Sequence, residues 1–105
     1  MLKGHLDAIV LAALEAGPAH GYAIIETIRR MSGEAFDLPE GTIYPALHRL
    51  EQAGLLASSW TDPAQGRRRR VYTLTDEGHG ALGRKREAWG RFSSAVNAVV
   101  TGGTS

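Results

Sequence analysis

Polar and basic side chains suited to contacts with nucleic acid are concentrated in two short stretches of this 105-residue sequence. In the first, EGTIYPALHRLEQAGLL at 40–56, apolar residues recur at the spacing of a buried helical stripe: Ile43, Ala46, Leu47 and Leu50. The opposite face of the predicted helix carries Thr42, Tyr44, Pro45, His48, Arg49 and Gln52. Hydroxyl groups can donate to phosphate oxygens, and arginine can donate two hydrogen bonds to a base edge. The spacing therefore favours a helix that could enter the major groove of DNA.

The second stretch, GRRRR at 66–70, places four arginines side by side: Arg67, Arg68, Arg69 and Arg70. Alternate residues of a strand face opposite sides, so these guanidinium groups cannot all serve the interior of a small domain. At a hairpin tip they would suit phosphate contact or insertion into the minor groove. A solubilising charge cluster is the alternative, but the preceding helix makes DNA contact the favoured interpretation.

Three predicted helices and a predicted hairpin position these two stretches. Apolar periodicity and turn residues predict helices at 2–16, 21–31 and 41–53, and strands at 55–61 and 70–74. This order predicts a mainly α fold with a small β-hairpin, that is, a winged helix-turn-helix domain over 1–75. A C-terminal dimerisation helix over 76–100 and a disordered tail over 101–105 would follow.

The last predicted helix begins at a capping threonine, Thr75, and has a heptad pattern that favours pairing with another helix. Its apolar residues form two interleaved rows seven residues apart: Leu82, Trp89 and Val96 in one, and Phe92 and Val99 in the other, with Lys85 interrupting the second row. This helix could instead pack on its own domain, but the first three helices already supply a core. We therefore expect these six residues to form the seam of a homodimer.

Three motifs resemble the PadR family of bacterial transcriptional regulators: HGYAI at 20–24, GTIYPALHRLEQAGLL at 41–56 and RRRVYTLTDEG at 68–78. The resemblance extends over nearly the whole chain and is to the compact branch of the family, which has one C-terminal helix. It implies a homodimer that binds a palindromic double-stranded DNA operator, usually as a repressor that a small molecule releases. Family members often have proline where Arg68 stands, so this wing is more basic.

On matching positions, the resemblance implies a phosphate or groove contact for Tyr44, flanked by Thr42, Pro45, His48 and Arg49. It implies structural roles for Gly21 and Tyr22, with Gly21 allowing tight helix packing and the Tyr22 ring filling core space. Tyr72 and Leu74 would point inward from the hairpin. The alternative for Tyr22 and Tyr72 is contact with DNA.

Aromatic residues of the last helix have a second interpretation. Some compact PadR relatives bind flat aromatic compounds between their subunits, stacked on tryptophans of this helix. The resemblance therefore makes Trp89 and Phe92 candidates for an effector site as well as for the dimer seam. We expect Trp60, on the first hairpin strand, to pack in the core or at a hinge.

Composition excludes several other classes of protein. Without cysteine the chain has no disulfide and no cysteine-based zinc site. No apolar run reaches the roughly 18 residues of a membrane span. Asp7 and Glu15 interrupt the N-terminal apolar segment, which argues against a signal peptide, so we expect a cytoplasmic protein.

Two alternative functions have less support in the sequence. Catalysis would need convergent polar groups, but the histidines lie on separate elements: His5, His20, His48 and His79. His48 and Glu51 have a spacing that could serve a metal, yet no third ligand lies nearby, so we expect no enzyme activity, metal or cofactor. A winged helix used only for protein–protein interaction predicts an acidic or apolar third helix and a weakly charged wing, which this sequence lacks.

Overall fold

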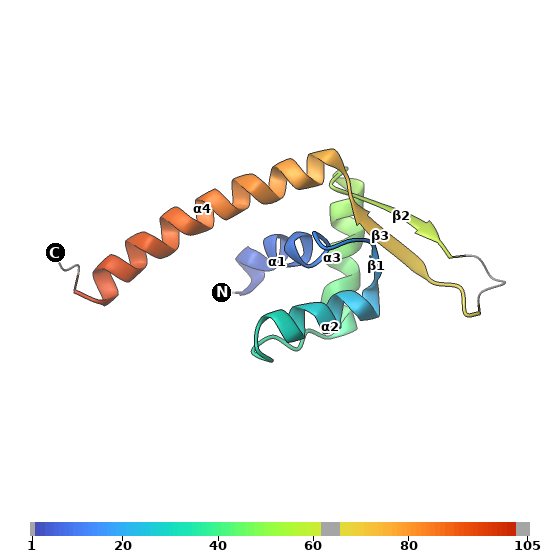
Figure 1. Ribbon diagram of the computed structural model, residues 1–105, viewed down its shortest axis with the longest axis horizontal. Coiled ribbons are helices and arrows are strands. Elements are labelled where there is room, and N and C mark those ends of the chain that lie inside the picture. The colour runs from blue at the N-terminus through green and yellow to red at the C-terminus, as the bar shows by residue number, and fades with distance from the viewer. Residues whose placement is uncertain (1, 62–65, 103–105) are drawn as a thin grey trace.

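The computed structural model describes residues 2–61 and 66–102, with side chains from residue 4 onward. Its elements, in chain order, are a short 3-10 helix η1 (Leu2–His5), α1 (Leu6–Ala13), β1 (Ala19–His20), α2 (Gly21–Met31), α3 (Glu40–Gln52), β2 (Leu56–Trp60), β3 (Arg70–Leu74) and α4 (Asp76–Val100). Figure 1 shows α1, α2 and α3 gathered beside the sheet, with the β2–β3 hairpin extending to one end and α4 to the other. The molecule measures 61 × 28 × 21 Å because these two elements project in opposite directions.

The core lies between the first three helices, the base of the hairpin and the first turns of α4. Its largest fully buried side chains are Val10, Leu11, Leu14, Ile24, Ile43 and Leu47. The predicted apolar stripe of α3 is confirmed, because all four of its residues are buried. Burial of that stripe determines which face of α3 stays outside.

The sheet is antiparallel, with strand order β1-β3-β2. The predicted hairpin is confirmed, and its register pairs Trp60 with Arg70 and Ser58 with Tyr72. Strand β1 is an addition that the sequence did not indicate, since two residues are too few to show any periodicity. Its residues Ala19 and His20 pair with Tyr72 and Val71. This pairing attaches the start of α2 to the β2–β3 hairpin, which is the wing of the fold.

Two aromatic residues lie where the sequence analysis did not expect them. Tyr22 is 58% exposed, so the prediction that its ring fills the core is wrong. The buried row of α2 is instead Gly21, Ile24, Ile25 and Ile28, and Tyr22 lies one position off that row. Trp60 is 51% exposed on the hairpin rather than packed in the core. Tyr72 is buried and Leu74 is half-buried, as expected for inward-facing residues of the hairpin.

Helix α4 begins as predicted at Thr75, whose Oγ1 accepts a hydrogen bond from the Gly78 backbone N–H (3.0 Å). The same hydroxyl donates to the Gly54 carbonyl oxygen (2.7 Å), which attaches the helix start to the turn after α3. Gly78 packs directly on that turn, because a Cβ there would overlap the Leu55 carbonyl oxygen. The first turns of α4 therefore belong to the same core as α1, α2 and α3.

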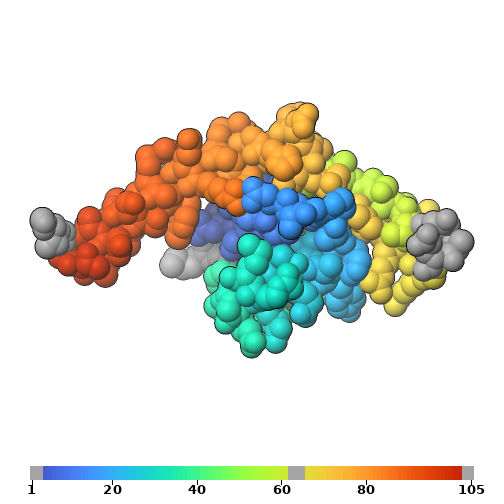
Figure 2. Space-filling model, viewed as in Figure 1, coloured from blue at the N-terminus to red at the C-terminus, as the bar shows by residue number. Residues whose placement is uncertain are grey.

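Helix α4 contacts the N-terminal part of the chain as far as Trp89, which lies beside His5, and its C-terminal part stands away from the rest of the molecule (Figure 2). Leu82 is only 2% exposed, so its predicted place in a dimer seam needs correction: its own chain already covers it. Helix α4 ends at Val100, and the Thr101 backbone N–H donates to the Asn97 carbonyl oxygen (2.9 Å). Thr101 and Gly102 thus form a turn that closes the helix, and the rest of the predicted tail, 103–105, lies outside the described residues. No helix in the described ranges is both long and apolar enough to cross a bilayer.

Candidate nucleic-acid interface

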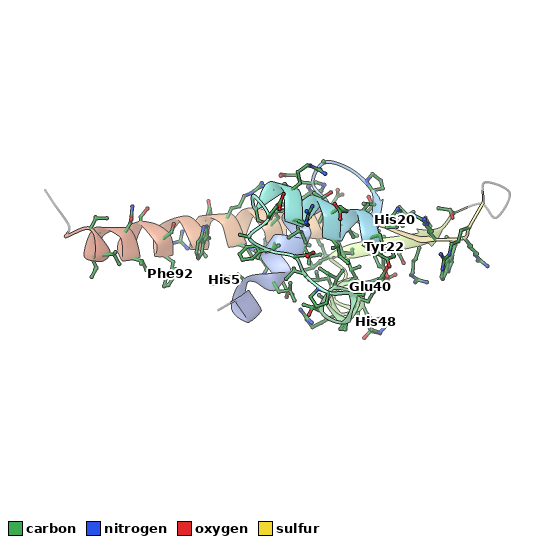
Figure 3. The ribbon with its side chains drawn as sticks, turned by 90° about the horizontal axis from the view of Figure 1, so that it is seen from below. His5, His20, Tyr22, Glu40, His48 and Phe92 are labelled. Carbon is green, nitrogen blue, oxygen red and sulfur yellow. The ribbon has the colours of Figure 1, made fainter. Side chains whose placement is uncertain are left out.

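The outer face of α3 presents the polar side chains that the sequence places opposite the buried stripe. Tyr44, Pro45 and His48 are exposed, and Thr42 is half-buried. Figure 3 shows the His48 side chain pointing outward from α3. Pro45 lies inside the helix and beyond its first turn, so it removes the backbone hydrogen bond to the Gly41 carbonyl. This face is held rigidly, since the four apolar residues behind it are fixed in the core.

The ring of Tyr44 is anchored on the first residue of α2. A Cβ at Gly21 would lie 2.5 Å from Cζ of Tyr44, so only glycine allows this approach. The expected role of Gly21 in tight packing is thus consistent with the structure, and the ring it accommodates belongs to Tyr44. Because Tyr44 is still 38% exposed, an anchored ring offers part of its surface at the interface.

Tyr22 and Glu40 extend the same side of the molecule (Figure 3). A hydrogen bond to the Glu40 carboxylate is the main cause that raises the pKa of Tyr22 above its ordinary value. Glu40 lies in the first turn of α3, where its negative charge interacts favourably with the helix dipole. The sequence analysis missed this pair, although the helical period of α2 already places Tyr22 outside the buried row.

Among the described residues, Arg49 is the one side chain on the outer face of α3 that has a charged partner. Its guanidinium forms an ion pair with the carboxylate of Asp7 on α1. The Arg49 side chain remains 57% exposed. Because the ion pair uses Nη2 of a guanidinium that has five N–H donors, Arg49 keeps donors for a phosphate or a base.

The four arginines of the wing have different surroundings. Arg70 donates from Nε to Ser58 Oγ (2.9 Å) and lies 3.4 Å from the carboxylate of Glu51 on α3. Ser58 Oγ donates to the same carboxylate (2.6 Å). This network attaches the hairpin to α3, so the structure gives Arg70 a bracing role where DNA contact was predicted. The same network involves Glu51, the residue whose spacing from His48 could have served a metal. No group of three potential metal ligands occurs among the described residues.

Arg67, Arg68 and Arg69 are exposed and occupy the outer part of the wing. The Arg68 guanidinium lies over the Trp60 ring, 4.8 Å from its centroid. Arg69 Nη1 lies 2.8 Å from Nε2 of His20, and its backbone N–H donates to Thr61 Oγ1 (2.9 Å). Three positive charges are thus displayed on the outer part of the wing, and short contacts within the wing and to β1 hold two of them, Arg68 and Arg69.

His20 connects the wing to α2. Its Nδ1 accepts from the Ala23 backbone N–H (3.3 Å) and so caps the helix, while its Nε2 faces Arg69. A neutral imidazole has only one acceptor nitrogen, so it can accept from Ala23 or from Arg69 but not from both. Burial and, second, the positive charge of Arg69 lower the pKa of His20.

The predicted seam of α4 forms an exposed apolar face. Trp89, Phe92, Val96 and Val99 are all exposed, and Lys85 is half-buried beside them. The rings of Trp89 and Phe92 have centroids 5.9 Å apart, and His5 of η1 lies edge-on to Trp89 at 4.9 Å. Arg86 and Glu15 form a two-fold hydrogen-bonded ion pair (2.6 and 2.8 Å) that joins α4 to the end of α1 and lowers the pKa of Glu15.

Comparison with known proteins places this geometry among regulators of transcription. Residues 10–84 match the model of the transcriptional regulator PadR-like family. A transcriptional regulator from Clostridium thermocellum has a similar structure (TM-score 0.83, 32% identity, covering 91% of this chain and 93% of that one). So does a PadR family transcription regulator from Clostridium difficile R20291 (TM-score 0.81, 32% identity, 92% and 99% covered). The transcriptional regulator Rv3488 of Mycobacterium tuberculosis is 43% identical over 60 residues, which are 57% of this chain and 55% of that protein.

Proposed function

Because the chain belongs to the PadR-like family of transcriptional regulators, we propose that it binds DNA sequence-specifically, as a homodimer that represses transcription at a palindromic operator. The observation that carries this proposal is the composition of the outer α3 face. Tyr44, Pro45 and His48 project from a helix whose other side is locked in the core. A rigid helix with such a face fits the dimensions of the major groove.

The wing supplies the charge that DNA binding needs. Arg67, Arg68 and Arg69 are exposed, while Arg70 braces the hairpin against α3. Guanidinium groups contact phosphate oxygens and release the counterions condensed on DNA, which contributes affinity independent of sequence. We assign Tyr44, Thr42, Pro45, His48 and Arg49 to the groove, where Arg49 would use the donors that Asp7 does not engage. This division lets the helix read sequence and the wing fix its position on the backbone.

The exposed face of α4 supports a homodimer. Trp89, Phe92, Val96 and Val99 leave an exposed apolar stripe on a helix whose C-terminal part stands away from the domain. A second copy of α4 would bury that stripe by the heptad packing that its spacing predicts. Lys85 would lie at the margin of this interface, and Leu82 would take no part in it. Two α3 helices would then enter successive major grooves about 34 Å apart.

Trp89 and Phe92 further support a response to a planar aromatic effector. Their rings lie close together and half exposed, so a flat ligand could stack on them between the subunits. Such a ligand would weaken operator binding only to the extent that it binds more tightly to a dimer geometry in which the spacing of the two α3 helices no longer matches the operator. Quenching of tryptophan fluorescence by planar aromatics, compared between Trp89→Phe and Trp60→Phe, tests this: the site requires that quenching disappear in Trp89→Phe.

The proposed function is tested on the DNA upstream of the chain's own reading frame, since regulators often act on their own or a neighbouring promoter. A nuclease footprint should show a protected inverted repeat with half-sites about one helical turn apart. Absence of protection there, together with failure to enrich any duplex from a randomised library, would favour a winged helix that binds proteins instead.

A further inference from the structure

Trp60 occupies an unusual position at the base of the outer wing. It is the last residue of β2, is half exposed, and pairs across the hairpin with Arg70. Two guanidinium groups approach its ring, Arg68 at 4.8 Å and Arg70 at 5.3 Å from the centroid. At these distances the ring quadrupole attracts both cations.

The two arginines differ in what else holds them. Arg70 donates a hydrogen bond to Ser58 and forms an ion pair with Glu51, and these contacts fix its position near the ring. Arg68 is exposed, and the Trp60 ring is the aromatic surface over which its guanidinium lies. A guanidinium carries five N–H donors, so a cation–π contact with one ring leaves donors available for another acceptor.

We propose that Trp60 is a positioning residue that holds the Arg68 guanidinium ready to bind a DNA phosphate. This inference rests on the proposed function and adds a residue that the DNA-contact assignments do not contain. A free arginine side chain loses rotamer freedom when it binds, and holding it beforehand reduces that loss. The Trp60 ring, 4.8 Å from the Arg68 guanidinium, supplies this restraint.

A double-mutant cycle on DNA binding tests this proposal. The probe is a fluorescent duplex of about 30 base pairs selected by the wild-type protein from a randomised library, long enough for two half-sites. Affinity and its salt dependence are measured for Trp60→Leu, Arg68→Ala and the double variant. Arg67→Ala, in the same exposed part of the wing, is the matched control, and thermal unfolding of each variant checks that the fold is retained.

We expect Trp60→Leu to weaken binding about threefold to fivefold, the size of the ordering cost that is saved when one long side chain is held beforehand. The slope of log K against log salt should stay unchanged, since no charge is removed, whereas Arg68→Ala should lower it by about 0.9 per arginine lost. Trp60→Leu should have no further effect in the Arg68→Ala background but its full effect in the Arg67→Ala background. Trp60→Phe should retain most of the wild-type affinity, because it keeps an aromatic face.

An equal loss from Trp60→Leu in both arginine backgrounds would overturn the proposal, because Trp60 would then act independently of Arg68. If Trp60→Leu lowers the unfolding temperature and Trp60→Phe restores stability but not affinity, the proposal also fails. These outcomes leave the proposed function intact. Failure to select any duplex, or wild-type binding that is insensitive to salt, would instead contradict the proposed function itself.

Discussion

The ring of Tyr44 on α3 lies against the backbone of Gly21, the first residue of α2, so closely that no side chain fits between them. This contact fixes the most prominent side chain of the proposed reading face. It also explains why the glycine of the HGY motif and the tyrosine of the GTIYPAL motif occur together in one chain.

Gly21→Ala should therefore destabilise the protein and weaken DNA binding, because the added methyl group overlaps the Tyr44 ring. We expect a loss of about 1 kcal/mol in the free energy of unfolding, measured by urea denaturation, because the overlap is with the phenol end of a part-exposed ring that can turn aside. The control is Gly83→Ala on α4, where a Cβ meets nothing within 4 Å. That substitution should stabilise the helix by about 0.5–1 kcal/mol. Equal effects of the two substitutions would disprove the Tyr44–Gly21 relationship.

Trp89→Glu should convert the protein to a monomer, since it places a charge in the middle of the apolar face of α4. Sedimentation velocity measures the change directly. Ser94→Glu adds the same charge on the exposed opposite side of the helix and should leave the dimer intact. An intact dimer of Trp89→Glu would mean that α4 does not form the seam.

Stability should fall as the pH drops through the ordinary His pKa of 6.5, because the pKa of His20 is lowered in the folded protein. Above that value the His20 ring is neutral in both the folded and the unfolded protein, and its contribution to the free energy of unfolding is fully present. As pH falls, the unfolded chain takes up the proton first, so unfolding becomes more favourable until the lower folded-state pKa is passed.

His20→Asn isolates this effect, because asparagine also caps helices but does not titrate. The difference in urea midpoint between the wild type and His20→Asn should change with pH in the stated direction. A difference that stays constant from pH 8 to about pH 5 would contradict the role of His20, since that interval contains its titration.

Thr75→Ala should cost about 1–2 kcal/mol, because it removes both the cap of α4 and the hydrogen bond to Gly54. Thr75→Ser keeps the hydroxyl and should restore most of the stability. Chemical denaturation compares the three proteins. If serine and alanine are equally destabilising, the hydroxyl is not the stabilising group.

The fold was predictable where local patterns and packing agree. The stripe of α3 and the threonine cap of α4 follow from spacing and residue type alone. The α2 period, read strictly from Gly21 through Ile24, Ile25 and Ile28, also places Tyr22 outside the core; the expectation of a buried ring came from the family motif instead.

Other features depend on residues far apart in the chain. The ion pair of Arg49 with Asp7 spans 42 positions, and the network of Arg70, Ser58 and Glu51 depends on how the hairpin meets α3. No local pattern encodes these pairs. These pairs decide which arginines are available to bind DNA. The sequence therefore indicated a basic wing, but it did not show that Arg70 attaches the hairpin to α3 or that the Arg68 guanidinium lies over Trp60.

The most direct test of DNA reading by α3 and the wing is the salt dependence of operator binding for the wild type and for a triple variant, Tyr44→Ala with Arg67→Ala and Arg68→Ala. Arg70 is left in place to keep the hairpin braced. For the wild type, the logarithm of the binding constant should fall linearly with the logarithm of the salt concentration. The triple variant should bind at least about tenfold more weakly, and the slope of this line should be smaller by about 0.9 per lost arginine. Wild-type affinity that ignores salt, or a folded triple variant that binds as tightly as the wild type, would contradict the account.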